Sequence, residues 1–528
     1  MTIRNDPGAT TDPDYKLAGR REWIGLAVLA LPALLASLEL TVTNLALPSI
    51  GKDLQASSTQ LLWTVDIYAF LLAGSLIAMG AWGDRIGRRR VLLIGAAGYG
   101  AASLLATHAH SIEVLIAARA IMGVAGATLM PSTLALAAAL VPHPRQRATA
   151  IAVIIASVSG GTAIGPLVGG WLLDRFWWGS AFLLAVPVMA VLLILVPILV
   201  PEHRGTGNQP LDILSAFLSV AAVLPVVYGI KQVAVEGVSG AAVLAVLTGL
   251  ALAVAFTLRQ QKLAEPFIDL TLFRNRTFAI AGATLALGIF VLWGSNYAIA
   301  QYLQLVVGLS PLTAGLWTAP SAVGVIALST LAPKLARRFR PTSVIGAGLM
   351  LSAVGYAVLT QVGGDHSLAI VVTGAVIASA GLGPMMALST DLVIGSAPPE
   401  RAGAAAAISS TTPQLGGAFG IAVLGSIITA TYRSKVQGTA PADTPPNAIT
   451  MFEENLSAAS IAADHLPQPL ATQLLALARD AYTAGLQLAA ATSIVIVTAT
   501  ASFIVLVARP NRRESLSAEE RPDEMFVC

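Results

Sequence analysis

The feature that most constrains this chain is a series of long apolar segments, each separated from the next by a short polar stretch. A helix that crosses the hydrocarbon core of a membrane needs about 20 predominantly apolar residues. Reading hydropathy along the 528 residues predicts fourteen such spans. They cover residues 23–48, 60–82, 91–107, 112–140, 148–173, 180–200, 211–235, 239–258, 278–303, 311–333, 342–362, 368–393, 402–431 and 481–507. The sequence therefore predicts an all-α integral membrane protein.

Composition excludes several other classes of protein. Only 11% of the residues are charged, against roughly 25% in soluble domains. The net charge of +3 gives no reason to expect a nucleic-acid partner. The only cysteine is the last residue, Cys528, and the six histidines lie near span ends or in loops without metal-ligand spacing. We therefore expect no metal site and no enzyme activity.

The distribution of Lys and Arg predicts which side of the membrane each loop faces. With fourteen spans, 24 of these residues fall on the side of both termini, 6 fall on the other side, and Arg119 lies within a span. Lys231 is one of the six residues that this count assigns to the outer segments. Because cytoplasmic loops carry the excess of basic residues, we expect a multi-pass protein of the inner (plasma) membrane with both termini in the cytoplasm.

The spans divide into two related groups of six with two additional spans between them. The segment 333–340 (PKLARRFR) weakly repeats the basic loop 80–90 (GAWGDRIGRRR) at the equivalent place. Paired six-helix bundles are typical of one large class of transporters. We predict a cytoplasmic N-tail, a first bundle, two linker helices, a second bundle and a cytoplasmic C-tail, at residues 1–22, 23–203, 204–277, 278–507 and 508–528. A long extracytoplasmic segment covers about 432–480, and we expect residues 470–480 to form a short amphipathic surface helix.

Four motifs carry a resemblance to a known family. Residues 80–90 match G-x-L-[AG]-D-R-x-G-R-[RK]-x, with Trp82 at the usual Leu. Residues 119–127 (RAIMGVAGA), 161–170 (GTAIGPLVGG) and 38–48 (LELTVTNLALP, with Glu39 at the usual Asp) resemble three further signatures. The chain thus resembles the major facilitator superfamily, and within it the fourteen-spanner drug:proton antiporters (DHA2). The stretch WTVDIYAF from Trp63 is similar to that of multidrug pumps of the QacA, SmvA and LfrA kind.

Two acidic residues are the strongest candidates for coupling transport to protons. Glu39 and Asp66 each lie in an otherwise apolar span, where an unpaired charge costs about 2.5–3.5 kcal/mol or more. Burial favours the protonated carboxyl group, and a cationic substrate favours the ionised one. Competition between proton and substrate for one carboxylate would give antiport, with either acid in that role. The alternative is a protonated carboxyl group that is only hydrogen-bonded, for example Glu39 to Thr43.

Arg119 is the one basic residue that we place in the middle of a span. Its donors need an acid, carbonyl groups or water. The resemblance implies that it faces the central cavity and assists protonation of the nearby acids. The alternative is a structural clamp to backbone carbonyls of the span 23–48.

Aromatic and amide side chains near the acids are candidates for binding substrate. Phe290, Trp293 and Tyr297 share one helical face, and rings on such a face attract lipophilic cations by ~0.5–2 kcal/mol each. An aromatic face is equally compatible with core packing or contact with lipid. The full set of predicted substrate contacts is Glu39, Asn44, Trp63, Asp66, Tyr68, Phe290, Trp293, Asn296 and Tyr297.

The two glycine-rich motifs are predicted to act in conformational change. In the loop 80–90, the resemblance implies a latch between the bundles that consists of Gly80, Gly83, Asp84, Arg85, Gly87 and Arg88. The alternative is that these arginines only anchor the loop at the cytoplasmic surface. The antiporter motif consists of Gly161, Gly165, Pro166, Gly169 and Gly170, which we expect to pack against the span 311–333; a kinked packing seam is the alternative.

These observations predict a monomeric, proton-coupled antiporter for amphipathic or cationic drugs such as quaternary ammonium compounds and dyes. No ATP-binding motif occurs, so we expect no cofactor and the proton-motive force as the energy source. The expected partners are lipophilic or cationic small molecules, protons and membrane lipids. Two alternatives are a dedicated exporter of one endogenous metabolite, antibiotic or lipid, and a membrane scaffold that transports nothing.

Overall fold

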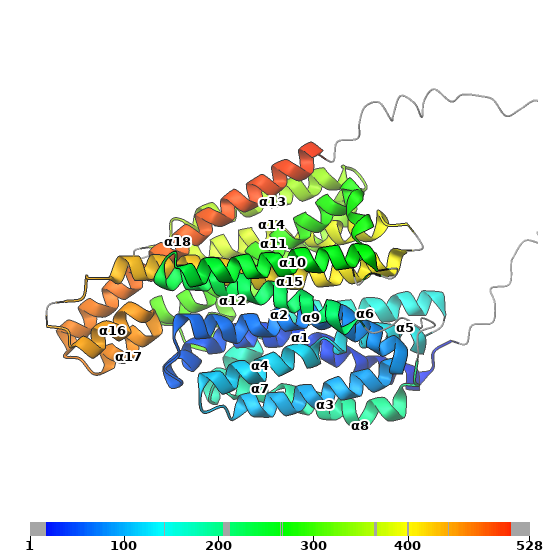
Figure 1. Cartoon of the computed structure of the whole chain (residues 1–528), viewed down its shortest axis with the longest axis horizontal. Coiled ribbons are helices and arrows are strands. Elements are labelled where there is room, and N and C mark those ends of the chain that lie inside the picture. The colour runs from blue at the N-terminus through cyan, green and yellow to red at the C-terminus, as the bar shows by residue number, and fades with distance from the viewer. Residues whose placement is uncertain are drawn as a thin grey trace, which may run out of the picture.

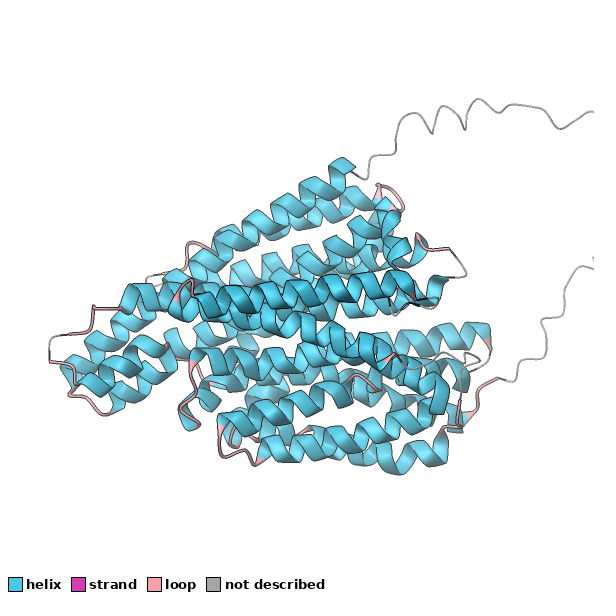
Figure 2. Ribbon diagram, viewed as in Figure 1, coloured by secondary structure: helices cyan, strands magenta, loops and turns pink. Residues whose placement is uncertain are grey.

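The structure is a computed structural model, and it describes residues 17–141, 143–203, 212–263, 266, 268–363, 367–398, 401–441 and 443–507. The predicted tails, apart from residues 17–22, and residues 204–211 at the start of the predicted linker region 204–277 lie outside the described residues. Helices account for nearly all of the described chain, and Figure 2 shows them connected by short loops. Fourteen helical segments are long and apolar enough to cross a membrane. The predicted fold class is confirmed.

The first half of the chain forms six spans from eight helices. Two spans are broken: α4 and α5 are separated by a turn at residues 127–128, and the short α7 precedes α8. The helices are α1 (Arg20–Asp53), α2 (Ser58–Ile86), α3 (Arg88–Thr107), α4 (Ile112–Gly126), α5 (Leu129–Leu140), α6 (Pro144–Arg175), α7 (Ser180–Leu183) and α8 (Ala185–Leu199).

Two further spans, α9 (Ile213–Glu236) and α10 (Gly240–Lys262), pack against each other and lie over the middle of the molecule (Figure 1). The second half follows the 3₁₀ helix η1 (Leu270–Arg274). It contains α11 (Arg276–Gln301) with the π-helical turn η2 (Tyr302–Val306), α12 (Pro311–Ala336), α13 (Pro341–Leu359), α14 (Ser367–Gly395), α15 (Ala402–Val436), α16 (Pro446–Glu454), α17 (Leu456–Asp464) and α18 (Gln468–Val507).

The two halves repeat one pattern of helix packing. In the first half α1 packs on α6, α2 on α4, and α3 on α8; in the second half α11 packs on α15, α12 on α14, and α13 on α18. Two long seams join the halves, one between α6 and α12 and the other between α2 and α15. Exchanging equivalent helices turns one seam into the other, so the halves are related by an approximate two-fold arrangement.

Glycines also allow the helices within each half to approach closely. A Cβ on Gly161 of α6 would lie 2.2 Å from the carbonyl oxygen of Leu34 in α1. A Cβ on Gly420 of α15 would lie 1.9 Å from the carbonyl oxygen of Phe290 in α11. Because lipid supplies no hydrophobic force between helices, such close contact of small residues is what holds spans together.

A helical hairpin of α16 and α17 covers one end of the bundle, called here the hairpin end. Both α1 and α18 have their other ends, at Arg20 and Val507, on the opposite side of the molecule (Figure 1). The hairpin falls within the predicted extracytoplasmic segment 432–480. The predicted separate surface helix at 470–480 is wrong, because these residues form the first turns of α18, which runs unbroken over 40 residues. After Pro469, near its start, this stretch contains no proline to end the helix.

Local side-chain hydrogen bonds fix where the key helices begin. Ser57 caps α2 by accepting from the amide of Gln60, whose side chain accepts in return from the amide of Ser57. Asp212 caps α9 and also pairs with Arg259 of α10 at 2.8 Å. Partial burial opposes ionisation of Asp212, but the hydrogen bonds from Arg259 and Ser215 outweigh it and lower its pKa. These contacts anchor α9 beside α10.

Candidate functional site

Glu39 and Arg119 form an ion pair inside the first half. The Arg119 Nη1 lies 2.6 Å from the Glu39 Oε1, and both side chains are almost fully buried. Arg119 also donates from Nε to the carbonyl oxygen of Thr64 at 3.0 Å. Its guanidinium stacks 4.2 Å from the centre of the Tyr68 ring. The arginine is therefore held by groups from α1 and α2, which keep it in one position.

The predicted alternatives for these two residues are not what the structure contains. The Thr43 hydroxyl has no hydrogen-bond partner, so Glu39 is paired with a base and not with that hydroxyl. The carbonyl that Arg119 contacts belongs to Thr64 in α2, not to the first span. Pairing with Glu39 combines the two predicted residues in a single unit.

Asp66 forms a second buried ion pair, and its partner was not predicted. The Lys231 Nζ lies 2.9 Å from the Asp66 Oδ2, with side-chain exposures of 1% and 0%. The same ammonium lies 4.1 Å from the centre of the Trp63 ring. One cation is thus accommodated between a carboxylate and an indole face.

The assignment of Lys231 to the outer loops is a correction that the structure requires. Lys231 lies within α9, four residues before the end of the span Leu214–Val235, and is turned inward. Arg119 is consequently not the only basic residue inside a span. A signal was present in the sequence, because Lys231 is the only charge between Asp212 and Glu236 and has apolar residues on both sides. A lysine so near a helix end normally extends to the membrane surface, and that expectation placed it outside.

Helix α9 brings Lys231 to Asp66 by packing into the seam between α2 and α15. Val227, one turn before Lys231, lies in a buried apolar cluster with Phe70 of α2 and Ala418 of α15. Residues four apart share a helix face, so Lys231 points toward the same seam as Val227. The added helices therefore contribute directly to the candidate site.

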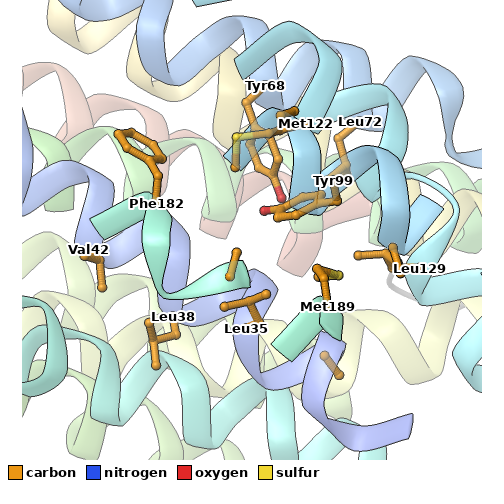
Figure 3. Close-up of a cluster of buried hydrophobic side chains, with 14 of the residues drawn as sticks. Leu35, Leu38, Val42, Tyr68, Leu72, Tyr99, Met122, Leu129, Phe182 and Met189 are labelled. Carbon is orange, nitrogen blue, oxygen red and sulfur yellow. The ribbon is translucent and has the colours of Figure 1, made fainter. Parts of the chain in front are cut away.

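The remaining predicted substrate contacts are dispersed. Tyr68 lies in the buried core of the first half, where Figure 3 shows it near Met122 and Tyr99, and Asn44 is buried in α1. Trp293 of α11 packs against α15, and a Cβ on Gly417 of α15 would overlap its ring. Phe290 is half-buried and Asn296 is exposed.

A small pocket near the hairpin end lies between the halves, with Tyr297 on its second-half side and Ser58 and Leu61 of α2 on the other. Its lining includes Tyr297 of α11, Tyr432 of α15, Tyr482 of α18 and Asn455 beside the hairpin. Among the predicted substrate residues, Tyr297 is the one that lines this pocket.

In this structure the charged side chains of the loop 80–90 contact groups of the first half. Asp84 pairs with Arg88 one turn later at 2.7 Å, and Glu202 lies near Arg89 and Arg90. Gly87 has a φ of 118°, a conformation that favours glycine, and connects α2 directly to α3. A latch between the halves, with Gly80, Gly83 and Arg85 as further members, stays a prediction.

The antiporter motif packs where it was expected, against α12. A Cβ on Gly170 would lie 2.5 Å from the Cα of Leu312, and one on Gly315 would lie 2.1 Å from the carbonyl oxygen of Pro166. Within the first half, Gly165 and Gly169 contact α1 at Thr41 and Val42. The packing is confirmed, whereas a role of the motif in antiport stays a prediction.

The halves are joined by hydrogen bonds at the hairpin end. Asp174 at the end of α6 accepts from the Ser310 hydroxyl and from the amide of Leu312. Between α2 and the hairpin, the Ser58 hydroxyl donates to the carbonyl of Glu454. The Asn455 side chain, beside the hairpin, also donates to the carbonyl of Ala56 in the loop after α1. The hairpin end is therefore closed.

The described residues contain no group of three or more His, Cys, Asp or Glu side chains that could hold a metal ion.

Comparison with known proteins decides the family. The sequence profile of the Major Facilitator Superfamily matches residues 29–421. The chain belongs to this superfamily. The multidrug efflux pump LfrA of Mycolicibacterium smegmatis is 41% identical over 95% of this chain and 98% of its own length. The methyl viologen resistance protein SmvA of Salmonella typhimurium is 34% identical over 88% of this chain and 93% of its own.

A solved structure supports the same fold. A bacterial homologue of the human lysosomal transporter Spinster, in an inward-facing and unoccupied conformation, has a TM-score of 0.65 at 18% identity and covers 96% of this chain and 100% of its own. The resemblance to multidrug efflux pumps of the superfamily is confirmed by the sequence profile and by the relatives LfrA and SmvA. The chain is a multi-pass membrane transporter and not an enzyme.

Proposed function

We propose that this chain exports amphipathic cations across the plasma membrane in exchange for protons. The observation that carries the proposal is the Asp66 carboxylate beside the Trp63 ring, where a cation, the Lys231 ammonium, already lies between them. A carboxylate and an aromatic face are the groups that bind a lipophilic cation in a dry site. Relatives named for multidrug efflux and methyl viologen resistance support this choice of substrate class.

Coupling to protons follows from the burial of the two acids. Asp66 lies eight residues after the first residue of α2, which places it roughly 12 Å along the helix and well inside the span. When the halves move and water reaches it from one side or the other, its carboxylate binds a proton or a cation but not both. We propose Asp66 as the shared site and the Glu39–Arg119 pair as its support, with the proton-motive force as the energy source and no cofactor.

The orientation of the chain determines which side of the membrane each end of the bundle faces. The excess of Lys and Arg on the side of the termini favours a cytoplasmic location for both. The hairpin end then faces outward, and its closure corresponds to an inward-facing state. Because one chain carries both halves, we propose a functional monomer.

The test is ethidium efflux from proteoliposomes with an imposed pH gradient, with and without a protonophore. We expect efflux to follow the gradient in the wild type and to be lost in Asp66→Asn. Asp391→Asn is the matched control, because Asp391 is an exposed acid on α14. Efflux that ignores the gradient, or that survives in Asp66→Asn, would remove the proposal. Failure to protect a pump-deleted host against ethidium and benzalkonium would favour a dedicated exporter.

A further inference from the structure

Lys231 reaches the candidate site from outside the two six-helix bundles. It comes from α9, and it places its ammonium between Asp66 and Trp63, both on α2. In the proposed function these are the groups that bind the cationic substrate. An ammonium group of the protein itself therefore lies where the substrate charge would bind.

Two simpler explanations for Lys231 do not fit its surroundings. A lysine that only anchors α9 at the membrane surface would extend toward water, yet this side chain is 1% exposed. A buried ion pair that is purely structural needs further hydrogen bonds to offset the loss of hydration. Apart from each other, neither the Asp66 oxygens nor the Lys231 Nζ has a hydrogen-bond partner within the part of the chain that the structure describes.

The nature of the two groups makes their pairing exchangeable. An ammonium is a compact charge on a flexible four-carbon stem and can lose its proton when buried. Its contact with Trp63 is a face contact that another cation can replace. The pair also lies at the seam of α2, α9 and α15, where the two halves meet.

We propose that the Lys231 ammonium is a tethered competitor that occupies the cation site at Asp66 and Trp63, and that a cationic substrate binds by displacing it. The proposal rests on the proposed function and defines its substrate class more closely. Asp66 then holds one of three cations at a time, namely a proton, Lys231 or the substrate.

A tethered competitor determines which cations are transported. A side chain attached by a short flexible stem competes at an effective concentration of about millimolar or more. A small hydrated cation makes only the contacts with Asp66 and Trp63 that the Lys231 ammonium already makes, so it has no advantage in binding free energy over Lys231. A lipophilic monovalent cation also buries apolar surface, which adds about 25 cal/mol per Å². The arrangement therefore favours large apolar cations and rejects small ones without any steric filter.

The experiment measures ethidium binding to the full-length protein in detergent by fluorescence anisotropy, in wild type, Lys231→Met and Lys231→Arg. We expect Lys231→Met to tighten binding about tenfold, because nothing has to be displaced. We expect Lys231→Arg to weaken it about tenfold or more, because a guanidinium binds a carboxylate through two hydrogen bonds and keeps its charge. Nile red, an uncharged dye, should bind equally to all three proteins.

The controls separate this proposal from the proposed function. Lys262→Met, an exposed lysine on α10, should change nothing. In the Asp66→Asn background, removing Lys231 should no longer tighten ethidium binding. If Lys231→Met proves unstable, Lys231→Arg, which keeps the charge, still tests the proposal through the expected loss of ethidium affinity. Unchanged ethidium affinity in both Lys231 variants, with loss of binding in Asp66→Asn, would overturn the competitor and leave the proposed function standing. Wild-type affinity in Asp66→Asn would overturn the proposed site itself.

Discussion

The two buried ion pairs of this transporter are alike in charge but differ in how they are held. Glu39–Arg119 lies wholly within the first half, between α1 and α4. Asp66–Lys231 connects the first half to an added helix, beside the seam with the second half. A pair inside one half moves with that half as a rigid body. The geometry of a pair at the seam changes whenever the packing of the two halves changes.

The bases of the two pairs differ in the same sense. The guanidinium of Arg119 is permanently charged, has a fixed fork of donors and contacts Glu39, Thr64 and Tyr68 together. The ammonium of Lys231 has a single acidic partner and one ring. A buried charge in a membrane protein can therefore either fix the structure or give way to another cation. The number of partners that hold the charge indicates which of the two roles it has.

The largest effect is expected from Arg119→Met, which tests whether the first pair fixes the structure. It leaves Glu39 buried without its base and Thr64 without its donor, and removing one member of a buried pair costs about 3–5 kcal/mol. Thermal unfolding of the purified protein should show a clear loss, and Arg119→Lys should restore little of it. Lys231→Met should cost less, because within the described residues the Lys231 ammonium has no hydrogen-bond partner besides Asp66 that its removal would leave unsatisfied. An equal loss of thermal stability in Arg119→Met and Lys231→Met would show that the two pairs contribute alike to the fold.

A second prediction concerns the double variant Asp66→Asn/Lys231→Met. Replacing both members of a buried ion pair by uncharged groups is often neutral or stabilising by about 1–4 kcal/mol. We expect the double variant to unfold at or above the wild-type temperature while losing gradient-driven ethidium efflux. The corresponding Glu39→Gln/Arg119→Met variant should stay less stable than wild type, because the carbonyl of Thr64 loses its donor. Full stability of that second double variant would show that both pairs are equally dispensable for the fold.

Most of the charged residues of these pairs could be predicted from the sequence, whereas their pairing could not. Fourteen spans could be predicted because each span has its own hydropathy signal, which depends on no other part of the chain. The charges of Glu39, Asp66 and Arg119 were conspicuous because each interrupts an apolar run. The separation of α4 from α5 at residues 127–128 was not predicted, although Pro131 cannot donate a hydrogen bond to the carbonyl of Ala127 four residues before it.

The partners of the charges could not be predicted, because they depend on how distant helices pack. Glu39 and Arg119 are 80 positions apart, and no local pattern links them. Lys231 was missed for a different reason. Its place near the end of a span is compatible with a surface anchor, and only the packing of α9 against α2 turns it inward.

A third prediction sharpens the description of the exchangeable site by changing its ring. Trp63→Leu removes the aromatic face but keeps an apolar side chain beside Asp66. A cation–π contact in a desolvated site contributes about 2 kcal/mol, so ethidium affinity should fall by roughly thirtyfold. Trp317→Leu, an exposed tryptophan on α12, is the matched control. If Trp63→Leu binds ethidium as the wild type does, the ring takes no part and Asp66 alone holds the cation.

The smallest effect is expected at the hairpin end, which closes without any buried charge pair. Partial burial raises the pKa of Glu454 above its ordinary value near 4.5, although the nearby Arg433 opposes the shift. A raised pKa means that the docked hairpin binds the proton more tightly than the undocked one. Docking is therefore strongest at low pH and weakens as the pH rises through the raised pKa of Glu454.

Glu454→Gln removes this proton-dependent change, so docking of the hairpin should become independent of pH over that range. Hydrogen exchange of the amides in α16 and α17, corrected for the intrinsic rate at each pH, measures it. The neighbouring Glu453→Gln is the control, since its side-chain oxygen can still accept from the amide of Gly438. A pH dependence that persists in Glu454→Gln would assign it to the exposed Lys52–Asp464 pair instead. Either result would leave the two buried pairs as the groups that distinguish a fixed charge from an exchangeable one.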